Sequence, residues 1–205
     1  MIKGLAKNFK KPRGFFGTVV LNRMNKGHEP LTKWALDFVS IGSETIILDV
    51  GCGGGNAVFL MSQQSKQVYG VDYAKASVRK SRQKNAAAIA AGNVEIRQAS
   101  VSSLPFEENT FDLVTAFETI YFWPDLPKDF LEIKRVLKPG GQFMAVFQNS
   151  PDETKRRSLE RTIDGMKIPF ANEVGETLKK AGFAQYTVYE NPRLEMTDIC
   201  VVGEK

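Results

Sequence analysis

A glycine-rich loop preceded by a carboxylate is the part of this sequence best suited to holding a ligand. The loop reads LDVGCGGGN over residues 48–56 and follows a short β-branched run. Glycines allow a backbone to approach a ligand closely, and a helix starting behind the loop would offer unpaired N–H groups. Asp49, two residues before Gly51, would repel a pyrophosphate but attract a cation. The loop therefore favours a ligand with a positively charged end.

A second carboxylate, Asp72, closes the next predicted strand, 21 residues after Gly51. A carboxylate at this position can accept hydrogen bonds from both ribose hydroxyls of a nucleoside, although a strand-end Asp can also cap the next helix. A nicotinamide dinucleotide would use such an acid as well, but its glycine pattern needs a third glycine where this chain has Asn56. The two carboxylates together favour S-adenosylmethionine (SAM), a nucleoside with a cationic end.

The elements that must position these residues alternate between strands and helices. Apolar periodicity predicts helices over 30–41, 56–65, 75–91, 126–137 and 171–181, and strands over 45–50, 67–71, 94–99, 111–117 and 142–148. Two further strands, 184–190 and 194–203, are joined by a short turn and should pair antiparallel. Residues 149–170 lack a clean period and are interpreted as an insertion. This order predicts an α/β fold with a doubly wound, mostly parallel sheet and a C-terminal antiparallel hairpin.

Four motifs in this order resemble those of the class I SAM-dependent methyltransferases, in the subgroup that contains many small-molecule enzymes. They are the loop LDVGCGGG, the strand-end Asp72, the segment SVSSLPFEENTFDLV over 100–114 and the turn VLKPGG over 136–141. The resemblance extends from about residue 45 to residue 203. It implies a seven-stranded, Rossmann-like methyltransferase sheet, SAM as methyl donor, S-adenosylhomocysteine as product and a small molecule as acceptor.

The same resemblance assigns the cofactor contacts position by position. The matched residues are Asp49, Gly51, Cys52 and Gly53 for the methionine part, Asp72 for the ribose, Tyr73, Ser100 and Val101 for the adenine, and Ala116 and Phe117 for the floor near the methyl group. Family members often have Asp at the position of Ser100, so this chain departs from the pattern there. A hydroxyl at that position offers an uncharged hydrogen-bond acceptor instead.

A catalytic base is required only if the methyl acceptor must lose a proton. His28, the single histidine, precedes the first predicted helix and could titrate near neutral pH, or could be a surface or capping residue. Glu118 and Tyr121 follow the fourth strand within ETIYFWPD, near the point where many relatives carry a histidine. Tyr121 would equally suit core packing. These three residues are the candidate catalytic groups.

Length and charge predict one domain with a basic N-terminal arm. We expect 30–205 to form a single SAM-binding catalytic domain and 1–29 an arm or lid. The net charge of the chain is +5, but residues 1–33 hold eight Lys or Arg and one acid and so account for +7. Such a segment could attract RNA, anionic lipid or an acidic substrate, or could simply be solvated. Methylation of RNA or protein remains an alternative, as does a non-catalytic SAM-binding module.

Several other classes of function receive little support from the sequence. The segment AFETIYF lacks the Asn-Pro-Pro-Tyr type of tetrapeptide found after the fourth strand in many base methyltransferases. No apolar run reaches the roughly 18 residues of a membrane span, and no Cys/His spacing suggests a metal site. Two cysteines are too few for a disulfide framework, so we expect a cytoplasmic protein. The sequence leaves the acceptor and the oligomeric state open.

Overall fold

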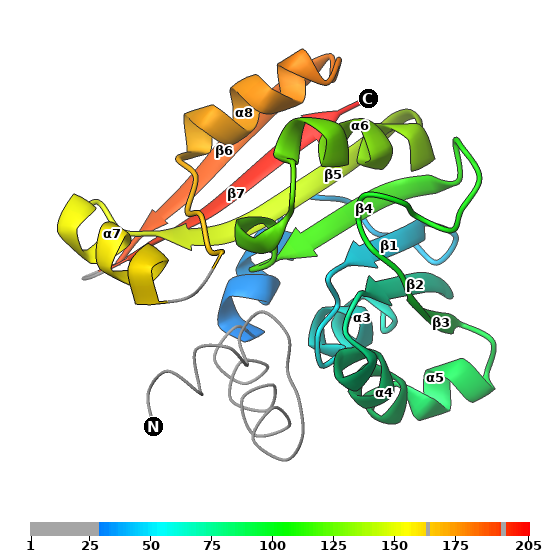
Figure 1. Ribbon diagram of the computed structural model, residues 1–205. Helices are drawn as coiled ribbons and strands as arrows, with labels where there is room; N and C mark the ends of the chain where they lie inside the picture. Colours follow the sequence, from blue (N-terminus) through cyan, green and yellow to red (C-terminus); the bar gives the residue numbers. More distant parts are fainter. Residues whose placement is uncertain (1–28, 163–164, 194–195) are drawn as a thin grey trace.

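A seven-stranded sheet forms the centre of the molecule (Figure 1). The computed structural model describes residues 29–162, 165–193 and 196–205. The strands are β1 (Ile46–Val50), β2 (Gln67–Asp72), β3 (Val94–Gln98), β4 (Phe111–Phe117), β5 (Leu137–Asn149), β6 (Gln185–Pro192) and β7 (Thr197–Glu204). Their order is β3-β2-β1-β4-β5-β7-β6, and β7 runs antiparallel to the other six strands. The predicted fold, a mostly parallel sheet with a closing antiparallel hairpin, is confirmed.

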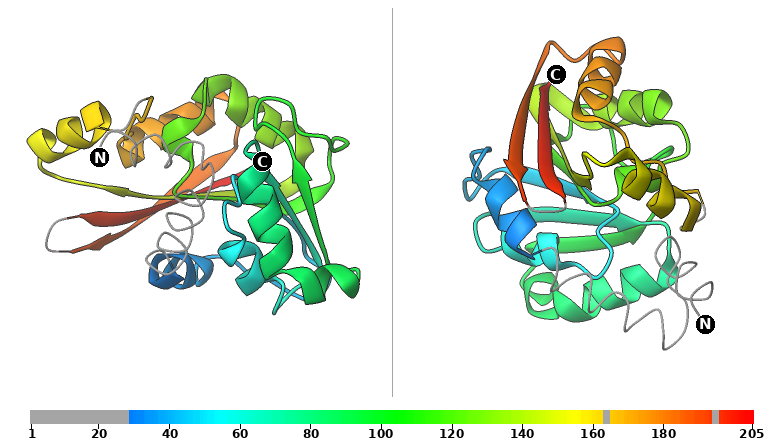
Figure 2. Two further views of the ribbon diagram at one scale, coloured as in Figure 1. Left: turned by 60° about the horizontal axis from the view of Figure 1, so that its bottom comes forward. Right: turned by 90° about the vertical axis from the view of Figure 1, so that its left-hand side faces the viewer.

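Helices cover both faces of this sheet (Figures 1 and 2). They are α3 (Asn56–Met61), α4 (Lys75–Lys84), α5 (Ala86–Ala90), α6 (Leu126–Val136), α7 (Glu153–Thr162) and α8 (Ala171–Lys180), with a 3-10 helix η1 (Ile120–Phe122) and a helical segment over 29–36. One core lies between the sheet and α6 and α8, around Phe130 and Phe143. The other lies under α3, α4 and residues 29–36, around Ile47 and Met61. Because both faces are covered, most residues of the central strands are apolar, and the polar exceptions include Asp49 in β1 and Asp112 and Thr115 in β4.

Parallel pairing of the central strands fixes the position of the functional loops. The register aligns Asp49 of β1 with Gly70 of β2 and with Thr115 of β4. The carboxyl ends of the three strands therefore meet at one edge of the sheet. The strand order changes direction between β1 and β4, and open α/β sheets bind their ligands at such a point.

The helix predicted over 75–91 is interrupted at Asn85. The side-chain amide of Asn85 donates to the carbonyl oxygens of Ser81 and Gly55, at 2.9 and 3.1 Å. These bonds tie the chain to the glycine-rich loop and compete with the helical ladder, which separates α4 from α5. The helices predicted over 56–65 and 30–41 were also too long, since they end at Met61 and at residue 36.

The strand predicted over 142–148 begins earlier, at Leu137. Leu137 pairs with Phe111, and after a shift in register Gln142 pairs with Leu113. The Pro-Gly-Gly run between them is therefore an irregular part of β5, as in a β-bulge. The segment 149–170, interpreted as an irregular insertion, contains α7. Within the described ranges, no helix combines the length and the apolar character needed to cross a bilayer.

Candidate functional site

A cavity of about 830 Å³ opens at the carboxyl edge of β1, β2 and β4. Its volume is typical of small-molecule sites. The structure brings most of the predicted site residues into its wall, namely Asp49, Gly51, Cys52, Gly53, Asp72, Tyr73, Ser100, Val101, Phe117, Glu118 and Tyr121. These residues come from segments far apart in the sequence, and the sheet edge is what gathers them.

The glycine-rich loop is held in a tight turn against the end of β2. The N–H groups of Gly51 and Cys52 both donate to the carbonyl oxygen of Val71, at 2.8 and 2.9 Å. Gly51 has φ +80°, and a Cβ there would lie 2.8 Å from the Cβ of Thr119 and nearer still to its hydroxyl. Glycine is therefore required both by the backbone conformation and by the space available. The loop packs directly on the segment that follows β4.

Asp72 links the glycine-rich loop to the start of α4. Its Oδ2 accepts a hydrogen bond from the N–H of Gly53 at 3.0 Å, and its Oδ1 accepts one from the N–H of Ala74 at 2.8 Å. Burial raises the pKa of this carboxyl, while these two bonds and one from Ser77 oppose the rise. A carboxylate has about four acceptor positions. Asp72 can therefore stabilise the loop and the helix start and still accept bonds from ribose hydroxyls.

Asp49 is buried beneath the same loop, with 2% of its surface exposed. Its Oδ1 accepts a hydrogen bond from the hydroxyl of Thr115 at 2.9 Å. Burial raises the pKa of Asp49 to about 7; the Thr115 bond lowers it, and the nearby charge of Asp72 raises it. A cation bound in the cavity would favour the ionised form of both carboxyls. This end of the cavity is therefore suited to a positively charged ligand.

Asn56, the residue that breaks the dinucleotide pattern, has an amide without a partner. Its Nδ2 is buried and makes no hydrogen bond to any described residue, and Asn56 lines the cavity. Leaving a buried donor unpaired costs about 1–3 kcal/mol, so a ligand acceptor would be favourable here. The carboxylate of SAM could accept from Asn56, while its cationic end suits Asp49 and its ribose suits Asp72. The residues present fit this cofactor.

The remaining predicted cofactor residues reach the cavity to different extents. Tyr73 is 38% exposed and Val101 is buried, and both line it. Ser100 also lines it, but its hydroxyl accepts a bond from the N–H of Ser102 at 3.3 Å within its own turn. Ala116 is fully buried in the core under α6 and is absent from the cavity wall. Phe117 is the last residue of β4 and reaches the cavity at the strand end, whereas Ala116 lies one residue further back in the strand.

Glu118 and Tyr121 meet in the wall that follows β4. The Tyr121 hydroxyl donates to Oε1 of Glu118 at 2.9 Å and accepts from the N–H of Gln148 at 2.7 Å. Burial raises the pKa of Glu118 to about 7, and the Tyr121 bond lowers it. Burial, followed by the charge of Glu118, raises the pKa of the Tyr121 hydroxyl far above its usual value. The pair thus combines a carboxyl that titrates near neutral pH with a neutral hydroxyl.

His28 lies outside the described residues, and its catalytic role stays a prediction. Thr119 and Trp123, which also line the cavity, were missed by the sequence analysis. Thr119 touches the glycine-rich loop and accepts a hydrogen bond from Nε1 of Trp123 at 3.4 Å. The aromatic run after β4 indicated that Trp123 could be near the site. No pattern identifies Thr119, because its contact with Gly51 joins two distant segments.

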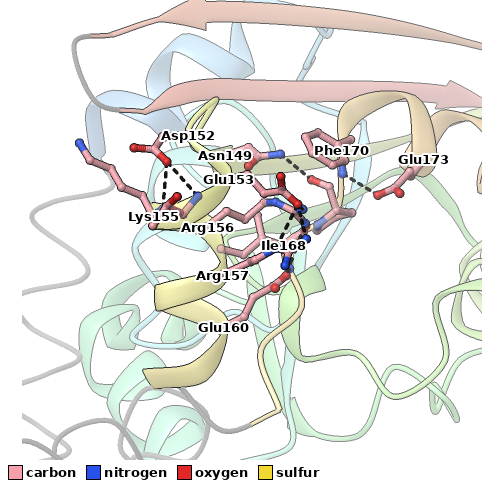
Figure 3. Close-up of polar contacts among 12 residues, drawn as sticks. Asn149, Asp152, Glu153, Lys155, Arg156, Arg157, Glu160, Ile168, Phe170 and Glu173 are labelled. Atoms are coloured by element: carbon pink, nitrogen blue, oxygen red, sulfur yellow. Dashed lines mark hydrogen bonds and ion pairs between the residues drawn. The ribbon is translucent and has the colours of Figure 1, made fainter.

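The segment that contains α7 reaches this part of the cavity through Gly165 and Lys167, which line it. Figure 3 shows polar contacts between α7 and the chain near Ile168. The N–H of Lys167, a lining residue, donates to the carbonyl oxygen of Tyr121 at 3.0 Å. The next residue, Ile168, donates its N–H to Glu160 of α7 at 2.9 Å, and Arg156 of α7 approaches both Glu160 and the carbonyl of Ile168. No residue of α7 is fully buried. Polar contacts therefore provide much of the link between α7 and the cavity wall.

Residues 48–145, which include the glycine-rich loop, Asp72 and the wall after β4, match a family model described as a methyltransferase domain. This chain carries a class I SAM-dependent methyltransferase domain. The matched range runs from β1 into β5 and holds most of the predicted cofactor contacts. The predicted family is therefore confirmed.

Relatives of this methyltransferase domain include two quinone methyltransferases. The demethylmenaquinone methyltransferase of Lactiplantibacillus plantarum is 30% identical over 151 residues, which are 69% of this chain and 64% of that protein. The 2-phytyl-1,4-naphtoquinone methyltransferase of Trichormus variabilis is 28% identical over 132 residues, 62% of this chain and 58% of that protein. The chain thus spans less than two thirds of the length of either relative.

A solved structure shares the fold of the methyltransferase domain and contains the cofactor. It is a phosphoethanolamine N-methyltransferase of Haemonchus contortus in complex with SAM, with a TM-score of 0.72 and 16% identity. The match covers 86% of this chain and 52% of that one. At this identity the comparison establishes the fold alone. Together with the family match, it supports SAM as the cofactor of this domain.

Proposed function

We propose that this chain transfers a methyl group from SAM to a small-molecule acceptor by in-line displacement. One observation carries the proposal: the cavity places a glycine turn between two buried carboxylates, Asp49 and Asp72, with the unpartnered amide of Asn56 beside them. Bound SAM would supply an electrophilic methyl group on a sulfonium that is already a good leaving group. The protein then has to bind and orient the reactants and exclude water, and such positioning can supply much of the rate.

Each part of the cofactor has a matching group in the cavity wall. We assign the ammonium of the methionine part to Asp49, the carboxylate of the same part to Asn56 and the ribose hydroxyls to Asp72. We assign the adenine to Tyr73, which follows β2, and to Val101, which lies after β3. The burial and the hydrogen-bond partners of these residues support these contacts. Substitution of each residue should therefore lower the affinity for SAM.

The acceptor side of the cavity favours a flat, apolar molecule. Its wall contains Phe117, Phe122, Trp123, Pro124 and Leu126. Aromatic side chains provide large apolar surfaces against which a ring can pack. Two of the relatives are named for quinone substrates. We therefore propose a ring compound of quinol or similar type as the acceptor.

Calorimetry with SAM and with S-adenosylhomocysteine tests the cofactor assignment, and both should bind. Isotopically labelled SAM, incubated with the chain and a small-molecule extract of bacterial cells, tests the transfer. Label should enter the low-molecular-weight fraction. Label in added RNA or protein would instead support a macromolecular acceptor, and binding without any transfer would support a non-catalytic module. Absence of binding by either nucleoside would end the proposal.

A further inference from the structure

One carboxylate in the cavity wall has no role in the cofactor site. Among the described residues four acids line the cavity, and two of them, Asp49 and Asp72, are assigned to SAM. Asp125 caps α6 by accepting from the N–H of Lys128 at 3.3 Å, and it also pairs with the ammonium of Lys128 at 3.1 Å. Glu118 lies among the aromatic residues of the acceptor side. It is the acid placed to act on the acceptor.

The backbone of Glu118 is in an unusual conformation. Its φ is +55°, in the left-handed region that non-glycine residues seldom adopt. Non-glycine residues held in this region tend to cluster at active sites and ligand-binding sites. It turns the chain out of β4 into η1 while the N–H of Glu118 still donates to Val146 of β5 at 2.8 Å. The turn sets the Glu118 carboxyl in the cavity wall.

Tyr121 fixes the direction of this carboxyl. The Tyr121 hydroxyl accepts the N–H of Gln148 at 2.7 Å and can give its own proton to Oε1 of Glu118 at 2.9 Å. The tyrosine is 4% exposed and its ring packs edge-on against Phe147. The hydroxyl contacts both Glu118 and the backbone of Gln148, and burial of the ring restricts its movement. Tyr121 is therefore a positioning residue for Glu118.

We propose that Glu118, oriented by Tyr121, is the general base of methyl transfer, and that the acceptor carries an ionisable hydroxyl of phenol or enol type. This inference rests on the proposed function. Glu118 takes the hydroxyl proton, and the electron pair of the O–H bond stays on the acceptor. These electrons, on the oxygen or on a conjugated carbon of the acceptor, form the new bond to the methyl carbon of SAM. The bond between the methyl carbon and sulfur breaks, and its electron pair stays on sulfur. The products are a carboxylic acid and a neutral thioether, so protons and charge balance. Methylation at carbon gives a dienone; its ring proton is then lost to water as the ring becomes aromatic again, and the acceptor oxygen takes back the proton from Glu118, so one proton is released overall.

Among the described side chains, Tyr121 and Asp198 affect the pKa of Glu118. Besides Tyr121 from η1, the buried Asp198 of β7 raises the pKa of Glu118 by its charge, and Asp198 is paired with Arg193 and accepts from Gln148. Lys167 lies at the rim of the same cavity. Loss of water around the carboxyl is the largest cause, and the pKa of about 7 that results is suited to a base working near neutral pH.

The test uses labelled SAM and a small-molecule extract of bacterial cells, with the full chain and three variants. Glu118→Gln keeps the shape and still accepts from Tyr121, and it should lower kcat by about 10²–10⁴-fold with little change in KM or in affinity for S-adenosylhomocysteine. Tyr121→Phe removes a bond that lowers the pKa of Glu118, so the acidic limb of the pH–rate profile should move to higher pH. Carboxyl NMR of the S-adenosylhomocysteine complex should show the same upward shift. Glu44→Gln, at an exposed turn, is the matched control and should behave as wild type.

The outcomes separate this inference from the proposed function. If wild type transfers no label, the proposed function itself fails. If label is transferred but Glu118→Gln keeps full activity, or the product is a quaternary ammonium or a sulfonium that lost no proton, the base assignment is overturned while the SAM site stands. Glu118→Asp, which retains a carboxylate, covers the case in which the Gln variant does not fold. This variant should have a lower kcat but keep the acidic limb of the pH–rate profile. A profile without that limb would also overturn the assignment of Glu118 as the base.

Discussion

Replacing Gly51 with alanine should destabilise the fold by about 2–5 kcal/mol. Two costs contribute to this figure. An alanine at φ +80° pays about 1–2 kcal/mol for the left-handed conformation. Its Cβ would also lie 2.8 Å from the Cβ of Thr119, closer than such atoms approach in proteins, and overpacking of this kind costs about 1–3 kcal/mol.

A matched control and a double mutant separate the two costs. Gly92 has φ +78°, but a Cβ added there would meet nothing within 4 Å, so Gly92→Ala should show the conformational cost alone. Thr119→Gly removes the obstacle to Gly51→Ala. The double variant should therefore be less destabilised than the sum of the two single variants, by about 1–3 kcal/mol. Thr119→Gly should not rescue Gly92→Ala.

Urea unfolding followed by circular dichroism measures these differences, provided that the slope m is unchanged. The variants should stay folded at low urea, since domains have about 5–15 kcal/mol of stability. If the Gly51 and Thr119 effects add within about 0.5 kcal/mol, or if Gly51→Ala costs no more than Gly92→Ala, then Thr119 does not confine the loop and the inferred packing of the glycine turn is wrong.

Three further predictions concern the carboxylates and Asn56. Asp72→Asn retains one oxygen but turns a donor towards the N–H of Gly53 or Ala74, so SAM affinity should fall by the equivalent of about 1–3 kcal/mol; an unchanged calorimetric affinity would remove Asp72 from the site. Asn56→Leu should weaken S-adenosylhomocysteine binding but leave 5′-methylthioadenosine, which lacks the carboxylate, unaffected; equal losses for both nucleosides would contradict the proposed contact. Because the pKa values of Asp49 and Glu118 are raised to about 7 in the folded state, the native protein holds protons that the unfolded chain releases at lower pH, and the free energy of unfolding without cofactor should fall as pH rises from about 5 to 7.5. Asp49→Asn should flatten part of this slope in urea midpoints measured across that range, and a midpoint that rose with pH would refute the assignment.

The gathering of Asp49, the glycines and Asp72 in one cavity was predictable from the sequence because it depends on local units. A strand, a turn and a helix placed Asp49 and the glycines together, and the next unit placed Asp72. Parallel strands carry their carboxyl ends to the same edge, so two local patterns sufficed to predict a shared site. The same reasoning located the antiparallel hairpin at the C-terminus. Where local competition intervened, as at Asn85, the prediction of a continuous helix was wrong.

The part of the cavity that we propose for the acceptor depended on the tertiary structure. Glu118 and Tyr121 were candidates by position, but the left-handed backbone of Glu118 and the bond from Gln148 to Tyr121 arise only when β4 and β5 pair. Thr119 became part of the site because the glycine turn packs against it.

The sequence alone was therefore enough to predict the class of cofactor, because charge and glycine spacing act over a few neighbouring residues. Which side chains line the part of the cavity after β4, and the burial that raises the pKa of the Glu118 carboxyl, were decided by packing between distant segments. Burial and hydrogen-bond partners of that kind exist only in the folded chain, and no local pattern encodes them.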